Sequence, residues 1–201
     1  MMCGHFLLYF QLYDTKNERF DPRSGKFRTQ SDWDSEILRI FAAKISNNNM
    51  PSRLFERPME DKYNLERFVE AQDTEPFAGY EHALAEMRAG QKRGHWIWYI
   101  FPQMRGLGHS PNSYLFGISG LDEAKAYLAH RVLGPRLRAI TEAVLEQTGE
   151  PADVLMGWEV DAMKLRSSMT LFDAASPDDI FGEVLDAFFD GSRCPLTLSL
   201  L

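Results

Sequence analysis

Two short segments of this 201-residue chain hold most of the side chains that could do chemistry. The first, residues 94–118, combines Trp96 and Trp98 with polar residues that apolar packing does not require. An indole face can stack on a planar ligand, and a buried Trp needs a partner for its N–H group. In the same segment the amide of Gln103 can read a polar ligand edge. The segment is therefore a candidate wall of a ligand pocket.

Three other features of residues 94–118 bear on binding and catalysis. His95 is the best candidate for a general acid or base, because an imidazole with an ordinary pKa near ~6.5 exchanges protons at neutral pH. The glycine pair Gly106 and Gly108 can bring backbone N–H groups close to a ligand, and Ser110 follows it. The alternative is a core segment with a satisfied histidine.

The second segment, residues 161–172, gathers cations and hydroxyl groups in an acidic part of the chain. One lysine and three hydroxyl residues lie close together there: Lys164, Ser167, Ser168 and Thr170. Ammonium and hydroxyl groups suit a phosphate or a carboxylate. An exposed i,i+3 pair of Lys164 with Asp161 would contribute only ~0.2–0.5 kcal/mol, so we assign the ammonium to anion binding. The alternative is a helix in which this pair forms and the hydroxyls bond locally to backbone.

Taken together, the two segments predict one pocket for a small anionic or nucleotide-like ligand. If the protein is an enzyme, hydrolysis or transfer at a glycosidic or phosphoester bond is the class of reaction to test first. The rival hypothesis is a non-enzymatic interaction domain. It rests on the 13 Lys and Arg against 22 Asp and Glu from residue 59 onward, a net charge of −9 that suits an acidic docking surface.

Composition excludes several other classes of protein. A net charge of −7 argues against a protein that wraps nucleic acid, because phosphate binding needs a basic surface. Cys3 and Cys194 lie near opposite ends without metal-ligand spacing, so we expect no metal, no cofactor and no disulfide scaffold. Gln11 and Asp14 interrupt the apolar opening before it could span a membrane, which favours a cytoplasmic protein.

Helical periodicity recurs from residue 63 onward and positions both segments. The apolar stripes predict five helices, at about 65–72, 77–87, 121–128, 133–144 and 177–188. Asn64, Thr74 and Ser176 are the expected caps of three of them. Strict alternation is nearly absent, so the fold class is all-α: a single compact multi-helix domain over residues 59–201.

Residues 1–58 differ in kind from the remainder. They are rich in polar and loop-forming residues, with only a short amphipathic pattern near residues 37–45. Such a composition lacks the apolar density needed to offset chain-ordering entropy. We expect a poorly ordered N-terminal extension that the domain does not need for folding.

The order of the motifs from residue 61 to 201 resembles one bacterial family. The motifs are Tyr63–Phe68, His95–Gln103, Gly106–Gly108, Tyr127–Gly134 and Lys164–Phe172. They are similar to the signature of domain of unknown function 1810, which implies a single mainly helical domain of unestablished biochemical role. Some members of that family carry a calpastatin label, but this chain lacks the repeats expected of such an inhibitor.

Overall fold

The structure is a computed structural model and describes residues 18–21, 26–29, 62–73 and 79–201. The chain divides into two compact units, Met1–Lys62 and Tyr63–Leu201. In the first unit, β1 (Glu18–Asp21) pairs with β2 (Lys26–Thr29) in an antiparallel hairpin. The rest of the expected extension, including the pattern at 37–45, lies outside the described residues, as does the expected cap Thr74.

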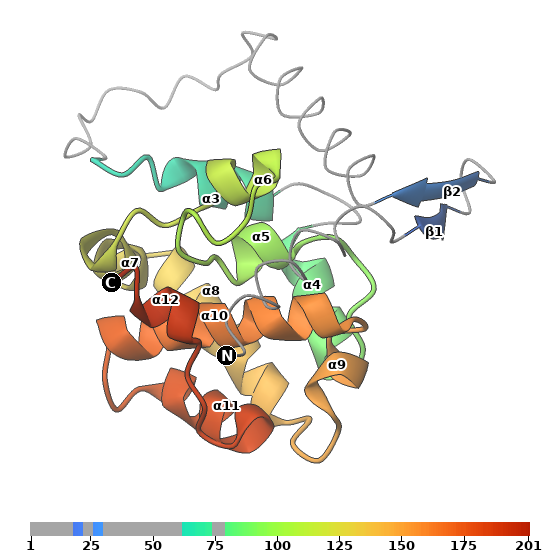
Figure 1. Ribbon diagram of the computed structural model, residues 1–201. Helices are drawn as coiled ribbons and strands as arrows, with labels where there is room; N and C mark the ends of the chain where they lie inside the picture. The colour runs from blue at the N-terminus through green and yellow to red at the C-terminus, as the bar shows by residue number, and fades with distance from the viewer. Residues whose placement is uncertain (1–17, 22–25, 30–61, 74–78) are drawn as a thin grey trace, which may run out of the picture. The chain divides into compact units, whose positions relative to one another are not determined.

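The second unit is built from helices, which confirms the mainly helical class (Figure 1). They are α3 (Glu66–Gln72), α4 (Tyr80–Arg88), α5 (Ile97–Ile100), α6 (Pro111–Leu115), α7 (Leu121–Ala129), α8 (Leu133–Leu145), α9 (Ala152–Leu155), α10 (Glu159–Ala175), α11 (Ile180–Phe189) and α12 (Pro195–Leu198). All five helices expected from periodicity are present, as α3, α4, α7, α8 and α11.

The longest described helix, α10, lies at the centre of this unit. It packs against α5, α7, α9, α11 and α12, so other helices surround it (Figure 1). Its buried residues therefore point in several directions, as Lys164, Leu165 and Ser167 do. A helix that is buried on several sides lacks a single apolar stripe, and periodicity alone did not identify it.

A chain of aromatic contacts joins four helices through the core. The ring of Phe68 in α3 meets the edge of Tyr127 in α7, with centroids 5.1 Å apart. Tyr127 in turn lies 5.4 Å from Phe172 in α10. Phe172 then lies 5.6 Å from Phe181 in α11. All four side chains are fully buried, and such pairs add ~0.5–1.5 kcal/mol each beyond the area that they bury.

Two predicted helix caps are wrong. Leu65, not Asn64, precedes the first turn of α3, while Asn64 has a φ of 51° and offers its carbonyl to the Arg67 side chain. Ser176 ends α10 because that helix continues to Ala175. The cap of α11 is Asp179, whose carboxylate accepts a hydrogen bond from its neighbour's backbone N–H.

Candidate functional site

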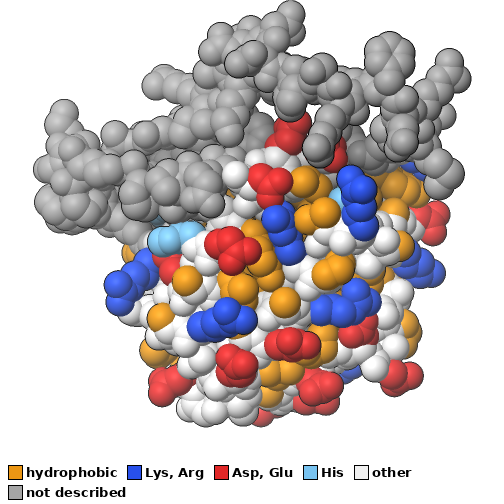
Figure 2. Space-filling view, turned by 180° about the vertical axis from the view of Figure 1, so that it is seen from behind, with side chains coloured by type: hydrophobic (Ala, Val, Ile, Leu, Met, Phe, Trp, Pro, Cys, Tyr) orange, Lys and Arg blue, Asp and Glu red, His pale blue; other side chains and the backbone are white. Residues whose placement is uncertain are grey.

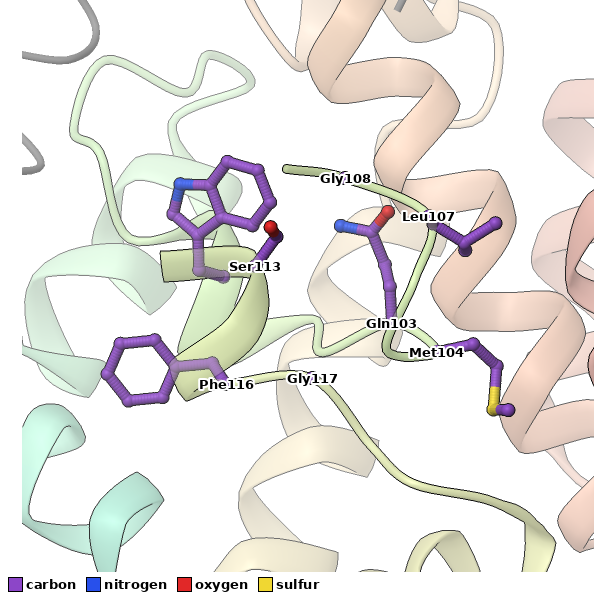
Figure 3. A pocket seen from close by; sticks show the side chains of 8 residues that line it. Gln103, Met104, Leu107, Gly108, Ser113, Phe116 and Gly117 are labelled. Atoms are coloured by element: carbon purple, nitrogen blue, oxygen red, sulfur yellow. The ribbon is translucent and has the colours of Figure 1, made fainter. Parts of the chain in front are cut away.

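A small pocket lies between the loop that follows α5 and the short helix α6 (Figure 3). Its described lining residues are Trp98, Gln103, Met104, Leu107, Gly108, Ser113, Phe116 and Gly117. The cavity measures about 10 Å³, or about 230 Å³ when its mouth, which is open to solvent, is included. The first figure is room for roughly one water-sized group. In this conformation the pocket therefore admits the end of a ligand rather than a whole nucleotide.

Backbone hydrogen bonds fix the base of the pocket. The N–H of Arg105 donates to the carbonyl of Ile118 at 2.8 Å, and the N–H of Ile118 donates to the carbonyl of Gln103 at 2.8 Å. Gly117 fits here because a Cβ would lie 2.5 Å from the carbonyl oxygen of Ser113. Glycine therefore permits a close approach of two backbone segments beneath the pocket.

The opposite wall is α6, which begins at a side-chain cap. Ser110 accepts a hydrogen bond from the N–H of Ser113 at 3.2 Å. The hydroxyl of Ser113 donates back to the carbonyl of Ser110 at 2.7 Å. A Cβ on Gly108 would lie 3.0 Å from the Cβ of Ser113, so the loop packs tightly against this helix end.

Gln103 is the polar side chain that marks the pocket. It is 7% exposed, and its amide makes no hydrogen bond within the described part of the chain. Figure 3 shows the amide end of Gln103 pointing away from the base of the pocket, toward the backbone at Gly108. The side chain of Ser113 lies across the pocket from this amide. The amide atoms are not among the described side-chain atoms that are fully buried without a partner, so they face the open pocket rather than the closed core.

Trp98 connects the pocket with the second segment of the sequence. Its ring lines the pocket, and the ammonium of Lys164 lies 3.9 Å from the ring centroid. The indole is 5% exposed, and its buried N–H has no hydrogen-bond partner within the residues that the structure describes. A desolvated cation on a Trp face contributes up to ~2 kcal/mol.

Beneath Trp98 lies a cluster of two lysines on one aspartate. Lys164 donates to Asp161 at 3.1 Å, and Lys92 donates to the other oxygen of the same carboxylate. None of the three residues is more than 9% exposed. Burial alone would raise the pKa of the Asp161 carboxyl, but the two ammonium groups and their hydrogen bonds outweigh it and hold the pKa well below its usual range.

This geometry corrects the premise on which Lys164 was assigned to anion binding, namely that its pair with Asp161 would be exposed and weak. The lysine is 3% exposed and is bound to Asp161, so the pair is a buried structural contact. Two of the neighbouring hydroxyls bond to backbone carbonyls of α10, as the alternative hypothesis states: Ser167 donates to Met163 and Thr170 donates to Arg166. Local bonding of this kind is common for Ser and Thr inside helices.

Trp96 serves a different part of the fold, and His95 is not among the described lining residues of the pocket. The indole N–H of Trp96 donates to Glu86 of α4 at 2.8 Å. The same carboxylate accepts the backbone N–H groups of Arg93 and Gly94. Burial would raise the pKa of Glu86, yet these hydrogen bonds outweigh it and lower the pKa. The carboxylate thus fastens the turn before α5 to α4.

Comparison with known proteins places the second unit in a family. Residues 62–201 match the family model described as protein of unknown function DUF1810. The chain belongs to this family. The crystal structure of the conserved hypothetical protein Rv1873 from Mycobacterium tuberculosis is similar, with 44% sequence identity and a TM-score of 0.66. The alignment covers 70% of this chain and 98% of that protein. No curated protein matches the chain.

Of the DUF1810 chain's candidate site residues, three line the pocket: Trp98, Gln103 and Gly108. The other eight are not among its described lining residues: His95, Trp96, Gly106, Ser110, Lys164, Ser167, Ser168 and Thr170. Sequence reasoning missed the other five described lining residues: Met104, Leu107, Ser113, Phe116 and Gly117. A signal for Ser113 was available, because Ser110 followed by Pro111 marks a helix start whose third residue folds back onto the cap.

Within the described ranges, no helix is long and apolar enough to cross a membrane.

Proposed function

We propose that this domain binds a small molecule by enclosing one polar end of it in the Gln103 pocket. The observation that carries the proposal is Gln103, a residue that is 7% exposed and whose side-chain amide has no hydrogen-bond partner within the described residues and lines a cavity. A ligand that closes this cavity would bury the amide, and a ligand group that pairs with it avoids the cost of burying it unpaired. Buried polar groups without a structural partner are typical of sites that await a ligand or an ordered water.

The walls of the pocket suit an organic group. Four of its described lining side chains are apolar or aromatic: Trp98, Met104, Leu107 and Phe116. Ligand sites typically combine such walls with a few convergent polar groups. Trp98 and Phe116 offer contact to a planar group such as a nucleobase, which supports a nucleotide-like ligand.

The anionic part of such a ligand is best placed outside the pocket, at Arg105. This exposed arginine donates to the carbonyl of Gly117, a lining residue, at 3.2 Å. One such bond leaves most of the guanidinium free for the bidentate contacts that phosphates and carboxylates favour. Lys164, which the sequence suggested for this role, is already engaged by Asp161.

The proposal is one of binding rather than of turnover. Hydrolysis or transfer would require an acid or base beside the ligand, and His95 is not among the described lining residues. The rival hypothesis of an acidic docking surface is not favoured by the face of the molecule that Figure 2 shows. On the face shown in Figure 2, Asp and Glu side chains alternate with Lys and Arg.

A thermal-shift screen with nucleotides, ADP-ribose, sugar phosphates and organic acids tests the proposal. A ligand at 100 times its Kd stabilises the folded state by ~2.7 kcal/mol, which raises the melting temperature measurably. We expect hits with the wild type that are lost in Gln103→Leu. Gln91→Leu makes the same substitution at an exposed glutamine and should keep them. Hits that persist unchanged in Gln103→Leu, or the absence of hits, would contradict the proposed site.

A further inference from the structure

We infer that the pocket selects a neutral, amide-type end: a group that carries an N–H donor and an oxygen or nitrogen acceptor side by side. This inference rests on the proposed function and names the class of ligand that the same site takes. Primary carboxamides, ureas and the amino-substituted edge of a nucleobase belong to this class. Carboxylates, phosphates and amidinium groups do not.

The described side chains of the pocket wall are uncharged. None of the described residues that line the pocket is ionisable. Of the buried cations nearby, Arg67, which also donates to Gly117, is paired with Glu123 at 2.6 Å, and Lys164 is bound to Asp161, a carboxylate that it shares with Lys92. An ionised group placed in the pocket would lose its hydration without gaining a counter-ion among the described lining residues. That loss costs far more than the loss of a neutral group's hydration.

The pocket wall offers both hydrogen-bond donors and hydrogen-bond acceptors. The Gln103 amide offers two N–H donors and one carbonyl acceptor. The hydroxyl of Ser113 has its proton committed to the carbonyl of Ser110, so it offers the pocket only acceptor lone pairs. The backbone N–H of Gly108, a lining residue, donates to no other described residue and is a further candidate donor. The wall thus presents both kinds of group, and a carboxylate, which only accepts, satisfies half of them.

An amide-type end fits Gln103 whichever way the side-chain amide is turned. Two amides placed edge to edge form a pair of hydrogen bonds, one in each direction, and rotation of the glutamine amide reverses both. The same bidentate geometry lets glutamine read the amino and ring-nitrogen edge of adenine. The ligand class therefore spans free carboxamides and a purine edge.

Three probes of the same shape test whether the pocket prefers a neutral amide-type group, an anion or a cation: acetamide, acetate and acetamidinium. Acetamide presents a donor beside an acceptor. Acetate presents two acceptors, and acetamidinium presents two donor groups. We would titrate each into the full chain at constant ionic strength and follow the side-chain NH₂ of Gln103 and the backbone N–H of Gly108 by NMR. The expected result is saturable shifts of both signals, with acetamide binding at least tenfold more tightly than either charged probe.

Variants of the same residue sharpen the test. Gln103→Glu replaces the donor with a second acceptor and adds a charge, so it should reverse the order and favour acetamidinium. Gln103→Leu should weaken acetamide at least tenfold, and Gln91→Leu should not change it. If Gln103→Glu does not fold, the order of the three probes on the wild type decides alone.

The possible failures are distinct. Acetate or acetamidinium binding most tightly at Gln103 would overturn the inference and leave the pocket as a ligand site. Non-saturating shifts for all three probes would overturn the proposed function together with the inference.

Discussion

The cluster of two lysines on Asp161 provides a sharp test of what holds the site together. Asp161→Asn keeps the shape of the side chain but removes the negative charge between Lys92 and Lys164, all of which are buried. Removing one partner from a buried ion pair typically costs ~3–5 kcal/mol, because the remaining charge stays uncompensated. Here two like charges are left behind. We expect a loss of that size in the free energy of unfolding, equivalent to a melting temperature roughly 10–20 °C lower.

The matched control is Asp173→Asn, in the same helix. Asp173 pairs with Arg193 at 2.9 Å, but the arginine side chain is 42% exposed. Surface pairs contribute at most ~1 kcal/mol. Urea unfolding of both variants at pH 7 should therefore show a several-fold larger loss for Asp161→Asn. A loss below about 1 kcal/mol for both variants would refute the reasoning.

The pH dependence supplies a second check on Asp161. Because its folded-state pKa lies below the unfolded value of about 3.9, the carboxylate stabilises the fold above that pH. This contribution is lost as the pH falls below about 4 toward the folded-state pKa. The difference in stability between the wild type and Asp161→Asn should thus shrink from pH 5 to pH 3. An equal difference at both pH values would contradict the assignment.

Three further predictions follow from the same contacts. Lys164→Met removes a charge-assisted hydrogen bond and a contact with the Trp98 ring, so it should destabilise the protein by about 1.5–3 kcal/mol in urea unfolding. Gly117→Ala forces a Cβ against the backbone of Ser113, so a loss of ~1–3 kcal/mol and shifted NMR signals around the pocket are expected. A chain that starts at Met59 should melt cooperatively within a few degrees of the full chain, and a large drop would show that residues 1–58 belong to the core.

The sequence predicted the helices whose apolar residues form one stripe. Helix α8 shows why: Leu133, Leu137, Ile140 and Val144 face one side and are all buried. Helix α10 does not follow this rule because helices surround it. Its polar residues look functional in the sequence, whereas Ser167 and Thr170 bond to carbonyls of their own helix.

The candidate site was predictable to the extent that one segment builds it. Trp98, Gln103 and Gly108 fall within eleven consecutive residues and line the same pocket. Lys164 shows the limit of sequence reasoning. Its pairing with Asp161 is local, but its burial beneath Trp98 depends on where α10 packs, and Lys92 reaches the same aspartate from 69 residues away. Spacing along the chain does not reveal such burial.

The proposed function depends on Gln103 holding a ligand group. The decisive measurement is the structure of a crystal of the protein that has been soaked in acetamide. We expect acetamide in the pocket, with its amide within about 2.7–3.2 Å of the Gln103 amide and its methyl group toward the apolar wall. A pocket without acetamide, in which the Gln103 amide instead bonds to a group of the protein itself, would contradict it.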